Sequence, residues 1–238
     1  MDFKSLREIV ASSDLVATHT DFVLSLAKPC VRITLSDRVT PGRSRFGGHP
    51  CVPGDFQWPT CDIGTYRFLG QIDFGEIINR PRTLPDSGLL SLFYAFSEDE
   101  DQFWHDDYIR GFYWSDLESF SDFKSPTEDV PAPQAIKLIG EMDIPRHWEL
   151  LKNSPFDYKT WNRFTRLLET NDNYLLGYPS FTSLAYDPTP EGDWISLLTV
   201  HSLPQFDWCW HDGDKLMVFI EQKELRQQSF NQLKSDAG

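Results

Sequence analysis

Short apolar runs, separated by polar or Gly- and Pro-rich segments, dominate the pattern along this chain. Residues 30–36 alternate apolar and polar positions, which is typical of a strand with one solvated face. Residues 89–96 are nearly all apolar or aromatic, which suits a central strand buried on both faces. The same reasoning predicts further strands at residues 69–74, 109–114, 135–142, 194–201 and 215–222.

Helical periodicity is limited to four segments. In residues 2–17, apolar side chains recur at helical spacing between charged ones. The other three segments are residues 145–153, 158–171 and 224–234. Residues 40–66 are rich in Gly, Pro and Trp, so they are expected to form an ordered loop or a set of short strands. Many strands, long loops and few helices favour an α+β fold with a mainly antiparallel sheet.

The second half of the chain echoes the first in the same order. Gly48-His49-Pro50 corresponds to Gly177-Tyr178-Pro179, residues 68–73 correspond to 196–201, and residues 86–94 correspond to 212–220. Nearly constant spacing between the matches predicts a duplicated unit. We therefore expect a single domain over residues 1–238, α+β in class, with mainly antiparallel sheets in two pseudo-symmetric lobes and peripheral helices. The repeat covers approximately residues 44–96 and 174–221, with an acidic and helical insert at 97–173.

The negative charge of the chain is concentrated in one region. The formal net charge is -14, and residues 86–129 hold twelve acidic but only two basic residues, a balance of -10. Nucleic acid is disfavoured as a partner because its recognition needs a basic footprint. A basic protein partner is favoured by long-range attraction, whereas the plainer explanation is a solvated loop that keeps the protein in solution. The candidate contact residues in this region are Glu98, Asp99, Glu100, Asp101, Asp106 and Asp107.

Recognisable catalytic, phosphate-binding and metal-binding motifs are missing from the sequence. It contains no Gly-x-Ser-x-Gly elbow and no phosphate-binding Gly-rich loop. The four cysteines have neither zinc-type spacing nor a dense disulfide pattern. A disulfide between Cys51 and Cys61 is left as an alternative to free thiols. His211 lies in a segment rich in Asp and Gly that a turn explains better than a metal site. No cofactor, metal ion or catalytic residue is therefore assigned, and enzymatic activity is left undecided but disfavoured.

The apolar runs and the start of the sequence also bear on the cellular location of the protein. No apolar run approaches the roughly 18–20 residues that span a bilayer, and no secretory signal is visible at the start. The four cysteines are expected to be reduced thiols, which is typical of cytosolic proteins. We expect a cytoplasmic protein that does not contact a membrane, and its oligomeric state is open.

Polar residues in and near the repeated strand are the best local candidates for a binding site. Gln71 and Asp73 are two residues apart in a predicted strand, so they point to the same side. Asp73 corresponds to His201 in the second copy, and Arg45 and Trp58 from the Gly-rich segment could close a cleft between the lobes. The alternative is that Gln71 satisfies backbone groups of the neighbouring loop and that Trp58 belongs to the core.

The order of these motifs resembles that of the YwqG-like family, a bacterial domain of unknown function with an α+β fold. The resemblance covers about residues 30–232. It rests on Ser44-Arg45-Phe46-Gly47-Gly48-x-Pro50-x-x-Pro53, Trp58-Pro59, Phe68-Leu69-Gly70-Gln71-Ile72, Leu84-Pro85-x-x-Gly88, Leu176-Gly177-Tyr178-Pro179, Leu197-Leu198, Trp210-x-Asp212 and Phe219-Ile220. The chain departs from the family pattern at Thr199 and Asp214, which argues against equivalent polar sites in the two lobes.

Two functional hypotheses follow. Some members of the YwqG-like family lie near genes for toxins delivered between bacteria, so the resemblance implies an immunity or antagonist role. The acidic region, the many aromatic residues and the missing catalytic motifs agree with a non-enzymatic protein-binding module, whose partner would be a basic toxin. The alternative is an enzyme or a small-ligand-binding protein with a cleft between the two lobes, since lobe junctions often form pockets.

Overall fold

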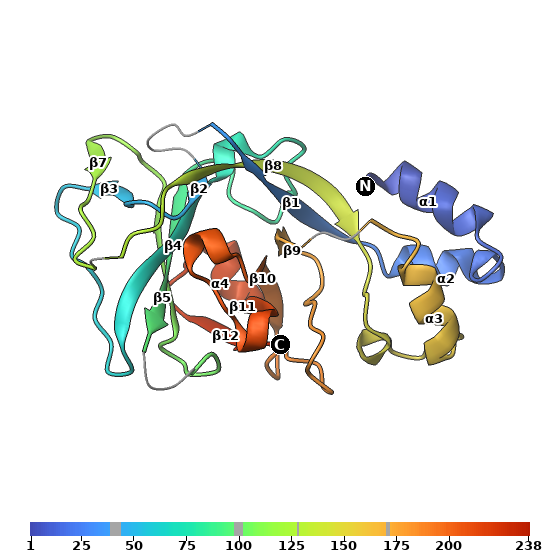
Figure 1. The fold of residues 1–238 in the computed structure, drawn as a ribbon. Coiled ribbons are helices and arrows are strands. Elements are labelled where there is room, and N and C mark those ends of the chain that lie inside the picture. Colours follow the sequence, from blue (N-terminus) through green and yellow to red (C-terminus); the bar gives the residue numbers. More distant parts are fainter. Residues whose placement is uncertain (39–43, 98–101, 128, 170–171) are drawn as a thin grey trace.

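One large antiparallel sheet forms the body of the protein (Figure 1). The computed structural model describes residues 1–38, 44–97, 102–127, 129–169 and 172–238. The ten strands of the sheet follow the order β12-β11-β10-β9-β1-β8-β2-β4-β5-β6. They are β1 (Lys28–Ser36), β2 (Arg45–Phe46), β4 (Thr65–Asp73), β5 (Leu89–Phe96), β6 (Ile109–Trp114), β8 (Gln134–Asp143), β9 (Tyr174–Leu176), β10 (Trp194–His201), β11 (Lys215–Glu221) and β12 (Leu233–Ala237). Two further short strands, β3 (Cys51–Pro53) and β7 (Phe120–Asp122), pair with each other beside this sheet.

The two outer strands of the sheet, β6 and β12, approach each other, so the sheet is nearly closed. The Tyr113 hydroxyl at the end of β6 donates a hydrogen bond to the side chain of Gln228 at 3.2 Å. Gly111 of β6 lies so close to the segment before β12 that a Cβ there would be 2.7 Å from the carbonyl oxygen of Phe230. Curling the sheet in this way encloses one large apolar core.

Both faces of the central hairpins are buried. In β5 the seven residues 89–95 are all buried, as expected for an almost continuously apolar strand. β11 is buried from Leu216 to Ile220, and β10 packs beside it. The predicted strands at 30–36, 69–74, 89–96, 109–114, 135–142, 194–201 and 215–222 are confirmed to within a few residues. The α+β class with a mainly antiparallel sheet is therefore also confirmed.

Three short helices form a second, smaller core at the far end of β1 and β8 (Figure 1). They are α1 (Phe3–Ser12), α2 (Thr20–Ser25) and α3 (Tyr158–Thr165). Trp161 of α3 is fully buried and donates a hydrogen bond from its indole nitrogen to the carbonyl oxygen of Pro145 at 3.1 Å. A fourth helix, α4 (Gln222–Arg226), follows β11, and the 3-10 turns are η1 (Ala17–His19), η2 (Phe74–Glu76), η3 (Trp148–Leu150), η4 (Pro204–Phe206) and η5 (His211–Gly213).

Two helix predictions are wrong. Residues 145–153 form only η3, and the remainder of that segment is irregular. The predicted helix at 224–234 is divided between α4 and the edge strand β12. Gln228 adopts a φ of 56° there, which ends α4 and turns the chain back along β11. Apolar spacing alone did not reveal that the open edge of β11 binds this segment as a strand. The helix predicted at 2–17 ends at Ser12, and the one at 158–171 ends at Thr165.

Candidate functional site

Three buried polar side chains form a row across adjacent strands of the sheet. Arg45 of β2 lies opposite Gln71 of β4, which lies opposite Ser91 of β5. Residues directly opposite in neighbouring strands project from the same face. All three are at most 4% exposed, and the Arg45 Nη1, Gln71 Nε2 and Ser91 Oγ atoms make no hydrogen bond with the described part of the chain. Buried polar groups of this kind cost about 1–3 kcal/mol each when unsatisfied, so the row is a candidate binding site.

The segment after β2 covers this polar row. The Gln71 Oε1 atom accepts a hydrogen bond from the backbone N–H of Cys51 at 3.0 Å. The guanidinium of Arg45 donates to the carbonyl oxygen of His49 and lies 3.4 Å from a carboxylate oxygen of Asp122. Burial lowers the pKa of Arg45, although the charge of Asp122 opposes this effect. The side chain of Gln71 thus fixes the loop, as the alternative explanation expected, and its amide nitrogen is left as a spare donor.

A pocket of about 330 Å³ opens beside Arg45. His49 and Asp122 line it together with residues 130–133. Guanidinium and amide N–H groups donate hydrogen bonds, and they favour carboxylate or carbonyl oxygens as ligands. The pocket can therefore receive an acceptor group, although the nearby Asp122 carboxylate weakens its attraction for an anion.

Asp73 and Trp58 lie near this row but serve local structure. The Asp73 Oδ1 atom accepts a hydrogen bond from the backbone N–H of Gly75 at 2.9 Å and caps η2. Trp58 packs edge-to-face on Phe93, with ring centroids 5.1 Å apart. The structure thus brings Arg45 and Gln71 into contact range, with Asp73 two residues further along β4.

His201 lies in the other half of the sheet. It ends β10, and four strands separate β10 from β4 in the sheet order. Its backbone N–H donates to the side chain of Asn173 at 2.9 Å, and its Nδ1 atom lies 2.7 Å from the carbonyl oxygen of Ser202. His201 therefore does not join the polar row around Gln71.

Only two of the six acidic residues that the sequence suggested as partner contacts, Asp106 and Asp107, lie within the described residues. The run Glu98, Asp99, Glu100 and Asp101 lies outside the described residues. Asp106 and Asp107 follow it in a loop between β5 and β6, where the Asp106 side chain is 80% exposed and lies 3.5 Å from the ammonium of Lys234. Asp107 forms an ion pair with Arg110. Both carboxylates are accessible, but each already has a basic neighbour.

An exposed tryptophan in the same loop was not singled out by the sequence. Trp104 is 67% exposed, more than any other large apolar side chain of the described residues. Its neighbour Phe103 is buried against Tyr108 and Trp210, and the carbonyl oxygen of Phe103 accepts a hydrogen bond from Ser235. The loop is thereby fixed to the core while the indole ring faces solvent. The adjoining acidic run was the available sequence signal.

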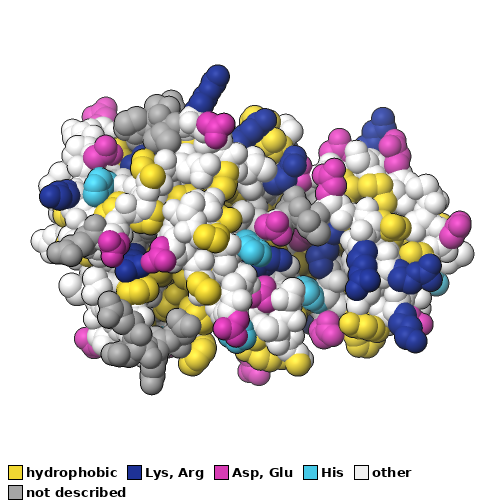
Figure 2. Space-filling view, viewed as in Figure 1, with side chains coloured by type: hydrophobic (Ala, Val, Ile, Leu, Met, Phe, Trp, Pro, Cys, Tyr) yellow, Lys and Arg dark blue, Asp and Glu magenta, His cyan; other side chains and the backbone are white. Residues whose placement is uncertain are grey.

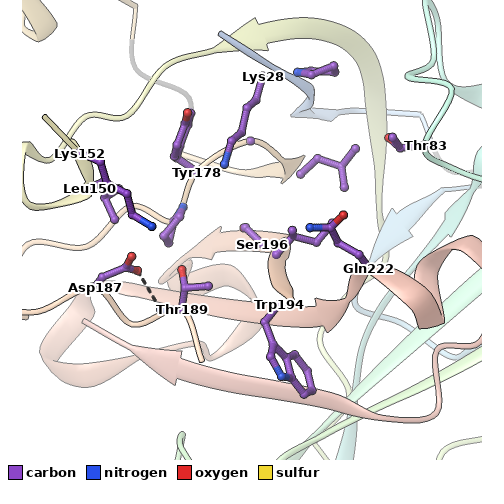
Figure 3. Close-up of a pocket in the computed structure, with 15 residues that line it drawn as sticks. Lys28, Thr83, Leu150, Lys152, Tyr178, Asp187, Thr189, Trp194, Ser196 and Gln222 are labelled. Carbon is purple, nitrogen blue, oxygen red and sulfur yellow. Dashed lines mark hydrogen bonds between the residues drawn. The ribbon is translucent and has the colours of Figure 1, made fainter. Parts of the chain in front are cut away.

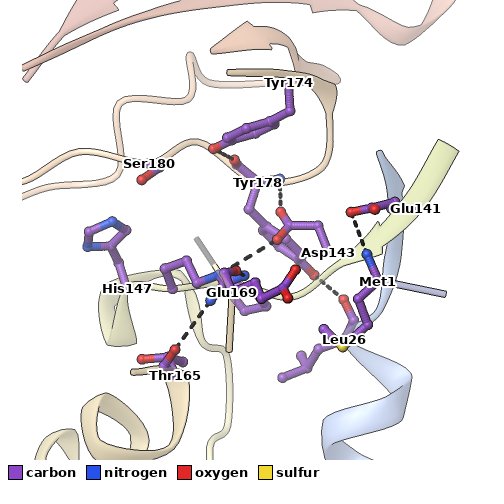
Figure 4. A network of polar contacts seen from close by, with 12 residues as sticks. Met1, Leu26, Glu141, Asp143, His147, Thr165, Glu169, Tyr174, Tyr178 and Ser180 are labelled. Carbon is purple, nitrogen blue, oxygen red and sulfur yellow. Dashed lines mark hydrogen bonds and ion pairs between the residues drawn. The ribbon is translucent and has the colours of Figure 1, made fainter. Parts of the chain in front are cut away.

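A second polar cluster lies where β8 and β9 end (Figure 4). The Asp143 carboxylate accepts a hydrogen bond from the backbone N–H of Tyr178 at 2.9 Å. The Tyr178 hydroxyl donates to the carbonyl oxygen of Leu26 at 2.7 Å, and its own carbonyl oxygen accepts from Tyr174. Arg146 donates to the backbone oxygens of Thr165, the last residue of α3, and of Glu169 beyond it. These contacts join the helical end of the protein, by which we mean α1, α2, α3 and the segments that pack with them in the second core, to the sheet.

Asp143 is the most unusual carboxylate of this cluster. Burial raises its pKa from the ordinary value of 3.8 to about 6, against the opposing effects of the Tyr178 N–H and of Arg146. Burial also raises the pKa of the Cys30 thiol nearby to about 12, so this thiol is un-ionised at neutral pH. The sequence carries no signal for this cluster beyond the Gly177-Tyr178-Pro179 motif.

The helical end has balanced charge, unlike the acidic region after β5: its residues 1–25 carry two basic and four acidic residues. Residues 144–169 carry five basic and three acidic residues. Figure 2 shows Lys and Arg side chains gathered over the helical end on the face that it presents. Among the described residues, no group of three or more His, Cys, Asp or Glu side chains is placed to hold a metal ion. Within the same residues, no helix has the length and apolar character needed to cross a membrane.

Comparison with known proteins identifies a family but no activity. The profile of a family described as "Domain of unknown function (DUF1963)" matches residues 44–235. No curated protein matches the chain.

Proposed function

Because the chain belongs to the family Domain of unknown function (DUF1963), whose description assigns no activity, we propose from its structure that it is a non-enzymatic module that binds a basic protein. The proposed contact surface is the Trp104 loop, which we define as residues 102–108. The exposure of Trp104 on a loop fixed to the core is the observation that carries the proposal. Tryptophan is among the residues that most often dominate the binding energy of protein interfaces.

The loop combines a rigid aromatic anchor with negative charge. Phe103 and Tyr108 are buried on either side of Trp104, so little conformational freedom is lost when a partner binds. Asp106 and Asp107 follow Trp104 in the same loop, and residues 86–129 have a balance of -10. A positively charged partner would be attracted over long range and could compete with Lys234 and Arg110 for these carboxylates. Charge complementarity therefore selects a basic protein rather than a nucleic acid or a second acidic copy of this chain.

The test uses the protein and two tryptophan variants as baits in the native host. Partners captured by the parent protein are purified, and their affinities are measured by calorimetry at several salt concentrations. Trp104→Ala is expected to weaken binding at least about tenfold, as loss of an interface anchor does. Trp148→Ala, at the helical end, is the matched control because Trp148 is 39% exposed and lies outside the loop.

Two results would contradict the proposal. One is a partner that binds the Trp104→Ala variant as tightly as the parent protein. The other is an affinity that does not fall with added salt, because attraction between accessible charges is screened.

Antagonism of a toxin is a narrower form of this proposal. It rests on the resemblance to the YwqG-like family, whose name we also propose for this chain, and not on the match to the domain of unknown function. Co-expression of the purified partner with the parent protein or with Trp104→Ala is the assay. Growth rescued by the parent protein alone supports antagonism, and a partner that does not inhibit growth excludes it.

Duplication of an ancestral unit is a further part of the proposal. Pairing the strands of the sheet from its two ends inwards matches β6 with β12, β5 with β11, β4 with β10, β2 with β9 and β1 with β8. This matching keeps the order of the strands along the chain, so β1, β2, β4, β5 and β6 correspond in turn to β8, β9, β10, β11 and β12. The pairing of β4 with β5 shifts register between Phe68 and Gly70, and that of β10 with β11 shifts between Ser196 and Leu198. These bulges fall at corresponding positions of the sequence repeat, which supports two pseudo-symmetric lobes within one domain.

Hydrogen bonds at the repeat ends support the same relation. Ser44 accepts a hydrogen bond through its side chain from the backbone N–H of Asp73, and Asn173 accepts one from that of His201. Asp73 and His201 are partners in the sequence repeat, and the spacing of Gly48 and Gly177 places Asn173, just before the second copy, opposite Ser44. Equivalent backbone contacts with different side chains agree with a shared scaffold whose functions have diverged.

Small-ligand binding is the second candidate function. A pocket between the helical end and the sheet favours it, although Arg45, Gln71, Asp73 and His201 are not among its lining residues.

A further inference from the structure

A pocket of about 380 Å³ lies where the helical end meets the second half of the sheet (Figure 3). Its walls come from the start of β1, the turn after β9, the start of β10 and the segments around residues 150–152 and 187–189. This volume is within the range of small-molecule sites, about 300–1,000 Å³. The polar residues used below are Lys28, Lys152, Tyr178, Asp187, Ser196 and Gln222.

Two lysines give this pocket a positive character within an acidic protein. In Figure 3 the ammonium ends of Lys28 and Lys152 turn toward the middle of the pocket. Among the described residues neither lysine forms an ion pair within 4.0 Å, whereas the protein as a whole has a net charge of -14. Asp187 is the single carboxylate among the described lining residues, so the lining carries an excess of one positive charge. An excess of one charge matches a monoanion better than a polyanion.

Lys28 is held in place at the pocket wall. Its ammonium lies over the ring of Tyr178, 4.0 Å from the centroid. The Tyr178 ring is itself fixed, because its backbone N–H donates to Asp143 and its hydroxyl donates to the carbonyl oxygen of Leu26. Burial lowers the pKa of Lys28, and the charges of Asp143 and Asp187 oppose that effect. A cation partly removed from water and fixed by an aromatic ring is prepared to bind an anion with little rearrangement.

The opposite side of the pocket offers a hydrogen-bonding group without a partner. Ser196 of β10 is only 3% exposed, and its hydroxyl makes no hydrogen bond to any residue that the structure describes. Figure 3 places Ser196 beside Gln222, across the pocket from Lys152 and Asp187. A buried hydroxyl without a partner costs free energy, which a polar atom of a ligand could recover. The remaining wall is largely apolar, with Pro29, Leu150, Leu176, Pro179 and Ile195.

We propose that this pocket binds a small organic acid, a monoanion whose carboxylate lies between Lys28 and Lys152 and whose apolar body lies against the apolar residues of the lining. The Ser196 hydroxyl and the Gln222 amide contact a polar atom of the same ligand. The proposal deepens the small-ligand binding named above as the second candidate function and rests on it, whereas the site is separate from the Trp104 loop and does not depend on the protein-binding function.

The test is calorimetry of the full chain at low ionic strength with four probes. Octanoate and phenylacetate carry a carboxylate on a linear or an aromatic body. Octanol lacks the charge, and inorganic phosphate lacks the apolar body. At least one of the two carboxylates is expected to bind at least about tenfold more tightly than octanol, as a charge-assisted hydrogen bond should provide, and phosphate is expected to bind more weakly than that carboxylate.

Three variants assign the binding to this pocket. Lys152→Met and Lys28→Met are each expected to weaken carboxylate binding about tenfold, because each removes one charge and keeps the apolar stem. Lys152 is on the surface, so its replacement preserves the fold even if that of Lys28 does not. Lys4→Met is the matched control, since Lys4 is exposed on α1 and loses the same charge. Ser196→Ala should weaken binding several-fold without lowering the unfolding temperature, a combination that a structural role for the hydroxyl would not give.

The proposal is overturned if octanol binds as tightly as octanoate, or if Lys152→Met and Lys4→Met bind the carboxylate alike. It is also overturned if neither carboxylate binds with a dissociation constant of about 1 mM or lower, since 1 mM is the weakest affinity that a small-ligand site of this kind should have. Trp104→Ala should leave carboxylate binding unchanged, so this experiment can fail or succeed independently of the protein-binding function.

Discussion

Replacing Asp143 by asparagine should change how the stability of the protein depends on pH. In the folded state burial raises the pKa of Asp143 to about 6, whereas its ordinary value is 3.8. The folded protein therefore binds this proton more tightly than the unfolded chain does. The free energy of unfolding contributed by the group is greatest below the unfolded pKa, and it decreases as pH rises towards the folded pKa.

The magnitude follows from the difference between the two pKa values. A pKa difference of about 2.2 means that the free energy of unfolding falls by about 3 kcal/mol when Asp143 goes from fully protonated to fully ionised. About 1.4 kcal/mol of this decrease occurs between pH 5 and pH 7.5. The amide side chain of the Asp143→Asn variant has no charge to lose, and its oxygen could still accept the hydrogen bond from Tyr178. The stability of this variant relative to the parent protein should therefore rise by about 1.4 kcal/mol over this range.

Urea-induced unfolding of both proteins, followed by tryptophan fluorescence at several pH values between 5 and 7.5, measures this difference. Asp62→Asn is the control, because it removes one carboxylate from an exposed position and should run parallel to the parent protein. If the curves of Asp143→Asn and the parent protein also run parallel, Asp143 is not desolvated in the folded state. The proposed cause of its raised pKa would then be refuted.

Two further substitutions test close packing and helix capping. Gly140→Ala should destabilise the protein by more than about 3 kcal/mol in urea unfolding, because its Cβ would lie 1.9 Å from the carbonyl oxygen of Asn79; Gly54→Ala, with open space around it, should cost less than about 1 kcal/mol. Asp157→Ala should lower the urea midpoint at pH 7, because the carboxylate caps α3 through the N–H of Thr160 at 2.7 Å, and equal midpoints would exclude that role. Hydrogen bonding to the same N–H lowers the pKa of Asp157, so the capping contribution should be lost as pH falls towards that pKa.

Local patterns determined much of the strand content. The apolar run at 89–96 is β5, and the alternation at 30–36 lies within β1, because one or both faces of these strands pack on the core. The helix predicted at 224–234 failed, since Leu233 fits an inward position in a helix or in a strand. The segment forms a strand because β11 would otherwise leave the N–H and C=O groups of its outer edge without partners, and β12 satisfies them. A sequence window contains no information about such a distant edge.

Candidate sites were predictable only where the residues that form them are neighbours in sequence. The same-side relation of Gln71 and Asp73 follows from their spacing in a strand, and both lie in β4. The pairing of Gln71 with Arg45 and Ser91 follows from strand register, which the long loop after β2 and the closure of the sheet decide. The raised pKa of Asp143 likewise depends on burial by segments distant in the chain.

The sequence by itself determined the strand-rich α+β class, the acidic region and the order of the repeated motifs, because each depends on residue type and spacing along the chain. Only the tertiary structure decided that Trp104 stays exposed, that each residue of the polar row keeps one polar atom without a partner among the described residues, and that Lys28 and Lys152 meet Ser196 in one pocket. Exposure, hydrogen-bond satisfaction and desolvation are properties of the space around a side chain. In this fold that space is filled by segments far away along the chain, such as Leu26 and Tyr178, which are 152 residues apart, or Phe103 and Ser235, which are 132 apart.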